Sequence, residues 1–274
     1  MLGKYICLNG KFINEKQAKI NVDNIEFSYG FGVYETIRLR NNKIYFLVEH
    51  LERLLDSAQV IGLEYSFSIA TMTQWVNSLV KKNKIESANI KMLLIGGQEP
   101  QLYIMLLAPV YLEKKNYREG VKVSTYQYER FLPQAKTLNM LPSYLAYRQA
   151  KESGAFDCLF LDKKNYILEG TRTNFFAIKN KTLYTTPVAK VLDGVTRRKV
   201  IACALENGYK VVEKNILLKD IMNYSGVFLT NTSGKIVPVR EVESYKVHKV
   251  IKFETICEET KNLIKLFDDY LERT

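Results

Sequence analysis

The sequence predicts a mixed α/β protein of the α+β type that is divided into two lobes. Runs with strand character alternate with segments of helical periodicity along all 274 residues. The charged stretch at residues 113–120 shows no hydrophobic periodicity and separates two groups of such segments. We therefore expect a smaller α+β lobe over residues 1–113, a linker over 114–119 and a larger, β-rich lobe over 120–274.

The smaller lobe opens with a predicted hairpin, whose strands at 5–8 and 12–13 are joined by Asn9-Gly10. A strand that begins with glycine follows over 30–39, and Asn41-Asn42 turns the chain into another strand at 44–47. Apolar residues at helical spacing predict helices over 48–61 and 68–82. Two strand-like runs, 90–95 and 101–110, complete the lobe.

The larger lobe is expected to begin with a strand at 121–126 and a helix at 142–152. Two hairpins are predicted next, 157–161 with 166–169 and 175–178 with 182–184. A helix over 196–207 is stopped by Gly208, a glycine well suited to a helix C-terminus. A short helix at 217–223, a strand at 227–230 and a long helix at 254–271 complete the prediction.

The composition argues against several classes of protein. No run reaches the roughly 18 apolar residues that cross a bilayer, and the N-terminus lacks a signal core, so we expect a cytoplasmic protein without membrane association. Four scattered cysteines and only two histidines predict neither a disulfide framework nor a metal centre. The net charge of +11 would suit nucleic acid, but the lysines follow no recognition motif. We expect a solvated basic surface that steers anionic substrates.

Two side chains in this order can operate one cofactor. Lys136 lies beside the apolar Leu138 and Met140, and desolvation makes an amine a better nucleophile. Glu169 ends a predicted strand directly before Gly170, where a turn can point a carboxylate into a cleft. Either residue alone is explained by a structural role. Together they suggest pyridoxal phosphate, because lysine forms a Schiff base with an aldehyde and a carboxylate keeps a pyridine nitrogen protonated.

Two clusters of amide and hydroxyl donors follow. Gly194 precedes a predicted helix at Val195 and Thr196, and the free amides at a helix N-terminus bind anions. A plain N-cap at Thr196 is the simpler alternative. Asn231 and Thr232 lie in a loop rich in hydroxyl groups after the strand at 227–230. Two such clusters downstream of a lysine and a glutamate suggest a phosphate-binding cup.

In their order these motifs resemble the class IV aminotransferase family, the fold type IV pyridoxal-phosphate enzymes. This family includes branched-chain aminotransferases, D-amino acid aminotransferases and aminodeoxychorismate lyases. The resemblance runs from about Ile6 to Val239 and rests on six motifs: Phe31-Gly32-Val33-Tyr34-Glu35-Thr36, Glu49-His50-Leu51-Glu52-Arg53-Leu54, Lys136-Thr137-Leu138-Asn139, Glu169-Gly170 with Asn174-Phe175, Gly194-Val195-Thr196-Arg197, and Thr230-Asn231-Thr232 with Pro238-Val239.

The resemblance implies a role for each cofactor residue. Lys136 matches the Schiff-base lysine, Glu169 the partner of the pyridine nitrogen, and Arg53 the phosphate-binding arginine. The other positions that match the family's cofactor-binding motifs are Asn174, Val195, Thr196, Asn231 and Thr232. It further implies a two-lobed fold with the cofactor between the lobes, no metal, and a homodimer with active sites near the interface.

Two departures from the family bear on the substrate. Branched-chain aminotransferases usually carry a tyrosine five residues after the lysine, where this chain has Leu141, which argues against a standard enzyme of that branch. The Arg-Gly pair of the other branches is replaced by Gly96-Gly97, so the usual arginine for the substrate carboxylate is missing. Arg38, Arg40 and Arg172 are candidate replacements, although each is also explained as a surface or structural arginine.

Three further residues complete the candidate substrate site, Tyr29, Tyr34 and Thr36. Aminodeoxychorismate lyases often hold a threonine near the cofactor at the position of Thr36, which favours that branch. A β-branched residue in a strand is equally expected from propensity alone.

The predicted function is transamination between an amino acid and a 2-keto acid, with the cofactor bound to Lys136. The amino donor displaces Lys136, whose freed amine then moves the α-proton. One alternative is aminodeoxychorismate lyase, which eliminates pyruvate to give 4-aminobenzoate. A pyridoxal-phosphate-binding protein without turnover and a basic nucleic-acid-binding protein are more remote, and the preference for L- or D-amino acids stays open.

Overall fold

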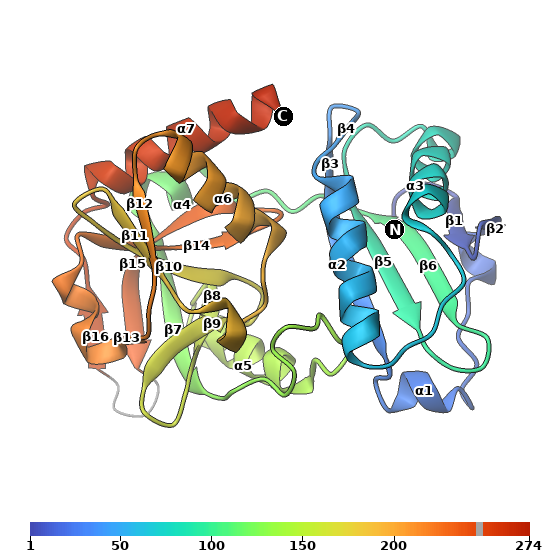
Figure 1. The fold of residues 1–274 in the computed structure, drawn as a ribbon, viewed down its shortest axis with the longest axis horizontal. Coiled ribbons are helices and arrows are strands. Elements are labelled where there is room, and N and C mark those ends of the chain that lie inside the picture. Colours follow the sequence, from blue (N-terminus) through green and yellow to red (C-terminus); the bar gives the residue numbers. More distant parts are fainter. Residues whose placement is uncertain (245–248) are drawn as a thin grey trace. The chain divides into compact units, whose positions relative to one another are not determined.

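The computed structural model describes residues 1–244 and 249–274, which form two compact units (Figure 1). The first unit comprises Met1–Val110 and Ala135–Met140, and the second comprises Tyr111–Gln134 and Leu141–Thr274. The chain thus leaves the first unit and later returns to it. The returning segment carries Lys136, which the sequence had placed in the larger second lobe.

An antiparallel sheet forms the first unit, with the strand order β2-β1-β6-β5-β3-β4. Its strands are β1 (Tyr5–Leu8), β2 (Lys11–Asn14), β3 (Gly32–Arg40), β4 (Lys43–Ile44), β5 (Ala88–Ile95) and β6 (Gln101–Leu107). Its helices are a 3-10 turn (Glu15–Gln17), α1 (Ile25–Ser28), α2 (Leu47–Val60) and α3 (Ile69–Asn83). The predicted hairpin and both long helices are therefore confirmed.

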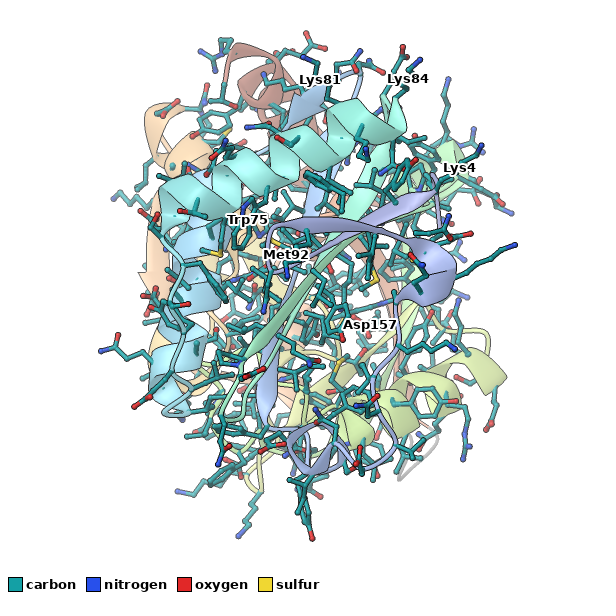
Figure 2. The ribbon with its side chains drawn as sticks, turned by 90° about the vertical axis from the view of Figure 1, so that its right-hand side faces the viewer. Lys4, Trp75, Lys81, Lys84, Met92 and Asp157 are labelled. Carbon is teal, nitrogen blue, oxygen red and sulfur yellow. The ribbon has the colours of Figure 1, made fainter. Side chains whose placement is uncertain are left out.

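The helices α2 and α3 pack on one face of this sheet. Leu54 of α2 and Val76 of α3 share a core with Ile37 of β3 and Met92 of β5, and all four are completely buried. Figure 2 shows α3 crossing the strands, with Met92 beneath the helix. Burial of one such side chain stabilises the fold by about 1.5–3 kcal/mol. The α2 and α3 sequences form helices because their apolar residues recur on the face that contacts the sheet.

The strand predicted at 44–47 is wrong beyond Ile44. Phe46 has φ 55° and ψ 39°, a left-handed conformation that cannot continue a strand. It places Leu47 at the start of α2 instead. Apolar residues alone could not reveal this turn, because Tyr45, Phe46 and Leu47 suit a strand equally well.

A larger mixed sheet forms the second unit, with the order β12-β11-β10-β14-β15-β7-β8-β9-β13 and β16 paired with β15. Its strands are β7 (Val121–Gln127), β8 (Asp157–Leu161), β9 (Tyr166–Gly170), β10 (Asn174–Lys179), β11 (Thr182–Thr185), β12 (Lys210–Glu213), β13 (Ile216–Leu217), β14 (Gly226–Asn231), β15 (Lys235–Ser244) and β16 (Lys249–Lys252). Because β10 also pairs with β9, the strands from β10 to β9 form a closed ring.

The helices of the second unit lie outside this ring of strands, and α6 and α7 contact each other (Figure 1). They are α4 (Lys114–Glu119), α5 (Leu141–Glu152), a 3-10 turn (Val188–Lys190), α6 (Val195–Glu206), a 3-10 helix (Leu218–Asn223) and α7 (Glu258–Arg273). The residues predicted as a linker therefore form the helix α4. The strand β15 was not predicted, since Pro238 inside a run argues against a central strand.

Three cysteine thiols are buried in the described part of the chain. Burial raises the pKa of Cys7 and Cys203 to about 11 and that of Cys158 to about 12, so these thiols stay protonated near pH 7. Within residues 1–244 and 249–274 no cluster of histidine, cysteine or carboxylate side chains could hold a metal ion. Across the same residues no helix combines the length and apolarity needed to cross a membrane.

Candidate active site

Lys136 lies on an extended segment that is fixed by the backbone of the first unit. The N–H of Tyr34 donates to the carbonyl of Lys136 at 3.0 Å, and the N–H of Leu138 donates to the carbonyl of Gly32 at 2.9 Å. The N–H of Lys136 itself donates to Ser57 Oγ of α2, also at 3.0 Å. The lysine backbone is therefore held on both sides, by the start of β3 and by α2.

Two amines contact the same aromatic ring. Lys136 Nζ lies 4.4 Å from the ring centroid of Tyr34, and Lys91 Nζ lies 3.6 Å from it. Lys91 is on β5, directly opposite Thr36 of β3. Burial and the charge of Lys136 lower the pKa of Lys91 to about 8, against the opposing effect of Glu35. Sequence reasoning missed Lys91, although a lysine inside the apolar run at 88–95 was a usable signal.

The pKa of Lys91 predicts how the stability of the cofactor-free protein depends on pH. The folded value of about 8 lies below the unfolded value of about 10.4, so between these values the unfolded chain holds a proton that the folded chain has released. The contribution of Lys91 to the free energy of unfolding should therefore rise by about 1–3 kcal/mol as pH increases from 7 to 10, while the buried thiols, whose pKa is raised, act in the opposite direction. Urea titrations of the parent and of Lys91→Met would measure this rise.

We expect the parent and Lys91→Met to differ in how the free energy of unfolding depends on pH. Lys91→Met should lose this increment, whereas Lys151→Met, which removes an exposed lysine of α5, should keep it. An identical pH dependence in the parent and in Lys91→Met would show that Lys91 is as well solvated in the fold as in the unfolded chain.

A buried ionic cluster joins β3 to α2. Glu35 is completely buried and accepts from Arg53 Nε at 2.6 Å and from Arg53 Nη2 at 2.9 Å. His50 Nδ1 lies 2.8 Å from the second carboxylate oxygen. Burial would raise the pKa of Glu35, but Arg53 and His50 hold it well below its usual range. Burial also lowers the pKa of His50, against the opposing effect of Glu35. The predicted phosphate arginine is therefore oriented by a carboxylate.

In the second unit, Glu169 lies where two strands meet. It pairs with Asn174 across β9 and β10, and only 3% of its surface is exposed. Its Oε1 accepts from Arg130 Nε at 2.8 Å, and its Oε2 accepts from the N–H of Leu192 at 3.3 Å. Arg130 was not predicted from the sequence, because a lone arginine in a loop after β7 carries no signal. The carboxylate is thus ion-paired and almost fully removed from solvent.

The turn after Glu169 is built around the buried carboxylate of Asp157. This carboxylate accepts from Thr171 Oγ1 at 2.5 Å, from Thr173 Oγ1 at 2.8 Å and from the N–H of Cys158 at 2.8 Å. A Cβ at Gly170 would lie 2.1 Å from Thr173 Oγ1, so no larger residue fits there. The direction in which the chain leaves Glu169 is therefore fixed.

The helix α6 begins near Asn174 of β10, the residue that pairs with Glu169. Its N-cap is Gly194, which has no side chain to cap the first amides, so the simpler reading of Thr196 as the N-cap is wrong. Asn174 Nδ2 donates to the carbonyl of Leu192 at 2.7 Å, and a Cβ at Gly194 would lie 2.1 Å from Asn174 Oδ1. Asn174 thus holds the turn that leads to the amides of Val195 and Thr196. These amides form the kind of helix N-terminus that binds anions.

The end of β14 supplies further polar groups next to Asn174. Thr230 pairs with Asn174 in the sheet, and its buried Oγ1 has no hydrogen-bond partner among the described residues. Asn231 Oδ1 accepts from the N–H of Gly234 at 2.6 Å and so shapes the loop that contains Thr232. A buried hydroxyl without a partner costs about 1–3 kcal/mol, which a ligand or a water molecule could offset.

The remaining candidate substrate residues belong to both units, Tyr29 and Arg38 to the first and Arg172 to the second. Tyr29 follows α1 and is 82% exposed. Arg38 Cζ lies 5.9 Å from the ring centroid of Tyr45. Arg172 is exposed, with its Cζ 4.1 Å from the ring centroid of Tyr147. The contact of Arg172 with Tyr147 does not distinguish it as a carboxylate ligand.

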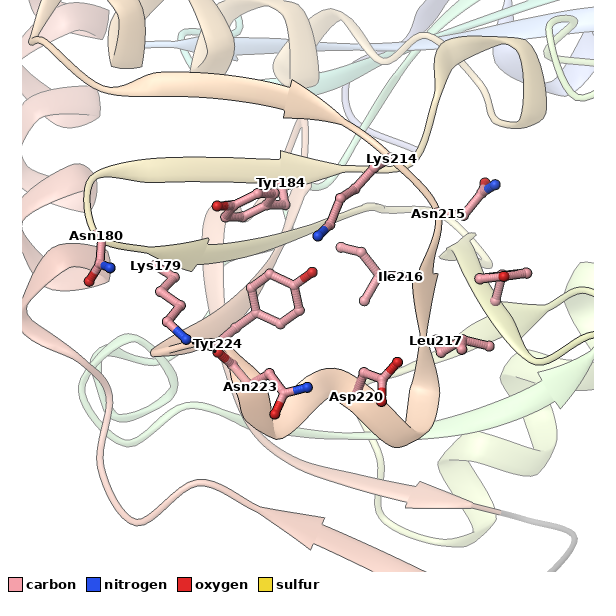
Figure 3. A pocket seen from close by; sticks show the side chains of 11 residues that line it. Lys179, Asn180, Tyr184, Lys214, Asn215, Ile216, Leu217, Asp220, Asn223 and Tyr224 are labelled. Atoms are coloured by element: carbon pink, nitrogen blue, oxygen red, sulfur yellow. Dashed lines mark hydrogen bonds between the residues drawn. The ribbon is translucent and has the colours of Figure 1, made fainter.

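The second unit also has a surface recess of about 540 Å³, shown in Figure 3. Lys214 Nζ lies there 4.8 Å from the ring centroid of Tyr184 and 5.5 Å from that of Tyr224. None of the predicted cofactor or substrate residues lines this recess. This recess is therefore not part of the predicted cofactor and substrate site.

Comparison with known proteins identifies the family. Residues 32–242 match the family described as Amino-transferase class IV. A protein of Methanocaldococcus jannaschii named "Putative branched-chain-amino-acid aminotransferase" is 34% identical, over 96% of this chain and 95% of its own. A D-alanine aminotransferase of Bacillus licheniformis is 28% identical, over 88% of this chain and 89% of its own. The chain belongs to the class IV aminotransferase family.

Solved structures agree with this assignment. The branched-chain amino acid aminotransferase of Escherichia coli has a TM-score of 0.86 and 26% identity, covering 98% of this chain and 95% of its own. A Legionella pneumophila protein titled "Putative 4-amino-4-deoxychorismate lyase" has a TM-score of 0.81 and 28% identity, covering 94% and 97%. The predictions of the family, of the fold type IV architecture and of a transaminase are confirmed.

Proposed function

We propose that this chain is a pyridoxal-phosphate-dependent aminotransferase that moves an amino group between an amino acid and a 2-keto acid, with Lys136 and Glu169 serving one cofactor. The observation that carries this proposal is the state of Lys136. Its backbone is fixed by hydrogen bonds, while its Nζ makes no hydrogen bond or ion pair with any described residue. An amine positioned in this way is available for covalent chemistry.

The chemistry of the residues in each unit suits the cofactor. Pyridoxal phosphate, when bound, supplies an electron sink for the substrate carbanion. Lys136 would hold the cofactor covalently and, once released, would carry the α-proton on Nζ. Glu169, which is buried and ion-paired, would keep a proton on the pyridine nitrogen. The groups proposed to bind the phosphate are Arg53, the amides of Val195 and Thr196, and the loop residues Asn231 and Thr232. Asn174 would hold the turn that leads into α6.

The substrate carboxylate needs a cationic or multi-donor partner. Tyr29, Tyr34, Thr36, Arg38 and Arg172 remain our proposed substrate residues. We add Lys91 to them, because its ammonium group contacts the same tyrosine ring as Lys136.

The second candidate function is aminodeoxychorismate lyase. Two observations favour it. Thr36 lies opposite Lys91 in the pairing of β3 with β5, and a solved structure with a similar fold is titled "Putative 4-amino-4-deoxychorismate lyase". A steady-state screen of L- and D-amino acids with 2-oxoglutarate and pyruvate, run beside aminodeoxychorismate, separates the two. Transamination predicts formation of a new amino acid from the added keto acid. Release of 4-aminobenzoate, without amino-group transfer, would favour the lyase.

Arg53→Ala should affect both the fold and the affinity for the cofactor. The substitution removes the guanidinium partner of the buried carboxylate of Glu35 and leaves it with His50, which we expect to cost about 3–5 kcal/mol of stability. If Arg53 also binds phosphate, cofactor affinity should fall by about 10- to 150-fold, the equivalent of roughly 1.5–3 kcal/mol. Urea unfolding of the cofactor-free protein and absorbance titration with pyridoxal phosphate measure the two effects.

A double variant separates these effects. Glu35→Gln combined with Arg53→Met removes both charges, so it should regain most of the stability lost in Arg53→Ala. Its cofactor affinity should stay low. Parent-like affinity in the double variant would reduce Arg53 to a structural partner of Glu35.

We also propose a homodimer and a cytoplasmic location. The support for the dimer is the family membership, since the resemblance implies active sites near a subunit interface. Sedimentation equilibrium of the purified chain would test it, and a monomer at all concentrations would contradict it. Fractionation of the source cells would test the location.

A further inference from the structure

Arg130 contacts the carboxylate of Glu169 through a fixed guanidinium. Its Nε donates to Glu169 Oε1 at 2.8 Å, and its Nη2 donates to the carbonyl of Thr171 at 2.8 Å. The ring centroid of Phe160 lies 5.3 Å from Arg130 Cζ, within the range of a cation–π contact. Its side chain is 24% exposed, against 4% for that of Glu169. The pair is therefore largely shielded from solvent.

Each group that holds Arg130 is itself held. Thr171 is tied to the buried carboxylate of Asp157 through its hydroxyl group and its N–H. Phe160 is completely buried, and the ring of Tyr128 packs edge-on against it, with the two ring centroids 5.1 Å apart. The guanidinium consequently cannot turn away from Glu169 without breaking contacts in two other parts of the unit.

A proton shared by a carboxylate and a pyridine nitrogen can reside on either atom. In a site shielded from water the neutral pair, carboxylic acid and pyridine, gains because neither partner then carries a desolvated charge. A guanidinium 2.8 Å from the carboxylate shifts this balance, because it stabilises the anion and leaves the carboxylate a weaker base. The proton then stays on the nitrogen, where it makes the ring a better electron sink.

We propose that Arg130 is a positioning residue that keeps Glu169 ionised, so that the proton which Glu169 shares with the pyridine nitrogen remains on that nitrogen. This inference rests on the proposed function, since it needs pyridoxal phosphate in the site. Arg130 acts through Glu169 and not on the reacting atoms. Its removal should therefore weaken the chemical step more than it weakens cofactor binding.

The test is the protonation of the bound cofactor, read by NMR with pyridoxal phosphate that carries ¹⁵N in the ring. The variant Arg130→Gln keeps N–H donors but removes the positive charge. The variant Arg130→Lys keeps a positive charge but lacks the planar guanidinium group. The matched control is Arg148→Met, which breaks an exposed ion pair on α5. We expect a protonated nitrogen in the parent, in Arg148→Met and largely in Arg130→Lys, and a shift toward the unprotonated nitrogen in Arg130→Gln.

Rates provide a second readout. Exchange of the substrate α-proton for deuterium should fall by about 10- to 100-fold in Arg130→Gln at saturating cofactor, a loss smaller than that expected from removing the charge of Glu169 itself. A protonated nitrogen in Arg130→Gln would overturn the inference. An unprotonated pyridine nitrogen in the parent between pH 6 and 9 would also overturn the inference. This second measurement does not depend on whether a variant folds. A parent that takes up no pyridoxal phosphate would instead overturn the proposed function.

Discussion

Lys136→Arg is expected to bind pyridoxal phosphate without covalent attachment and to lose about 10⁴-fold or more in the rate of amino-group transfer. Arginine keeps the positive charge but stays protonated, so it can neither condense with the aldehyde nor accept the α-proton. Loss of proton transfer alone accounts for about 10²–10⁴-fold. Single-turnover rates with an amino donor measure the loss, and borohydride reduction followed by peptide mapping locates the attachment site.

The matched control is Lys91→Arg, because Lys91 contacts the same ring of Tyr34. This variant should still be labelled at Lys136 after reduction. The parent should be labelled at Lys136 and at no other lysine. A label on Lys91 in the parent would transfer the covalent role to the neighbouring amine and overturn our assignment.

Glu169→Gln is expected to remain yellow and to bind the cofactor within about an order of magnitude of the parent, yet to lose about 10²–10³-fold in α-proton abstraction. Glutamine has almost the same shape, and its carbonyl oxygen can still accept from Arg130 or Leu192, but the negative charge is gone. The proton at the pyridine nitrogen is then no longer stabilised, and the substrate carbanion is harder to form.

Single-turnover experiments with α-deuterated and unlabelled amino donors follow this step directly. The isotope effect should be larger in Glu169→Gln than in the parent, because proton abstraction becomes more fully rate-limiting. Near-normal half-reaction rates in the fully loaded variant would leave Glu169 as a structural residue at the end of β9. They would also remove the basis for a role of Arg130.

Local patterns predicted the elements of the fold better than their boundaries and pairings. The helices α2 and α3 followed from apolar residues at helical spacing, and the first hairpin followed from Asn9-Gly10, both of which have positive φ. The end of the strand at Ile44 depended on a left-handed residue, Phe46, whose side chain gives no hint of it. The return of Lys136 to the first unit depended on pairing with β3, which no local pattern encodes.

The candidate site was predictable where a motif carried a distinct chemistry. Lys136, Glu169 and the start of α6 could be proposed from the sequence because each has a residue type or turn that suits one role. Arg130 was not predicted, since among 40 lysines and arginines only its three-dimensional neighbours distinguish it, and Lys91 was not predicted although it lies inside an apolar run. Their significance comes from a carboxylate 2.8 Å away in one case and from a shared tyrosine ring in the other.

The return of the segment Ala135–Met140 to the first unit makes the order of folding part of how this enzyme becomes active. The N–H of Lys136 and its acceptor on Ser57 are 79 residues apart in sequence. Contacts of such separation form slowly, because the entropy of closing the intervening chain is lost before they contribute stability. A nascent chain that ends at Val110 would lack the segment that hydrogen-bonds to Gly32 and Tyr34, so Lys136 reaches its position only after part of the second unit has been synthesised.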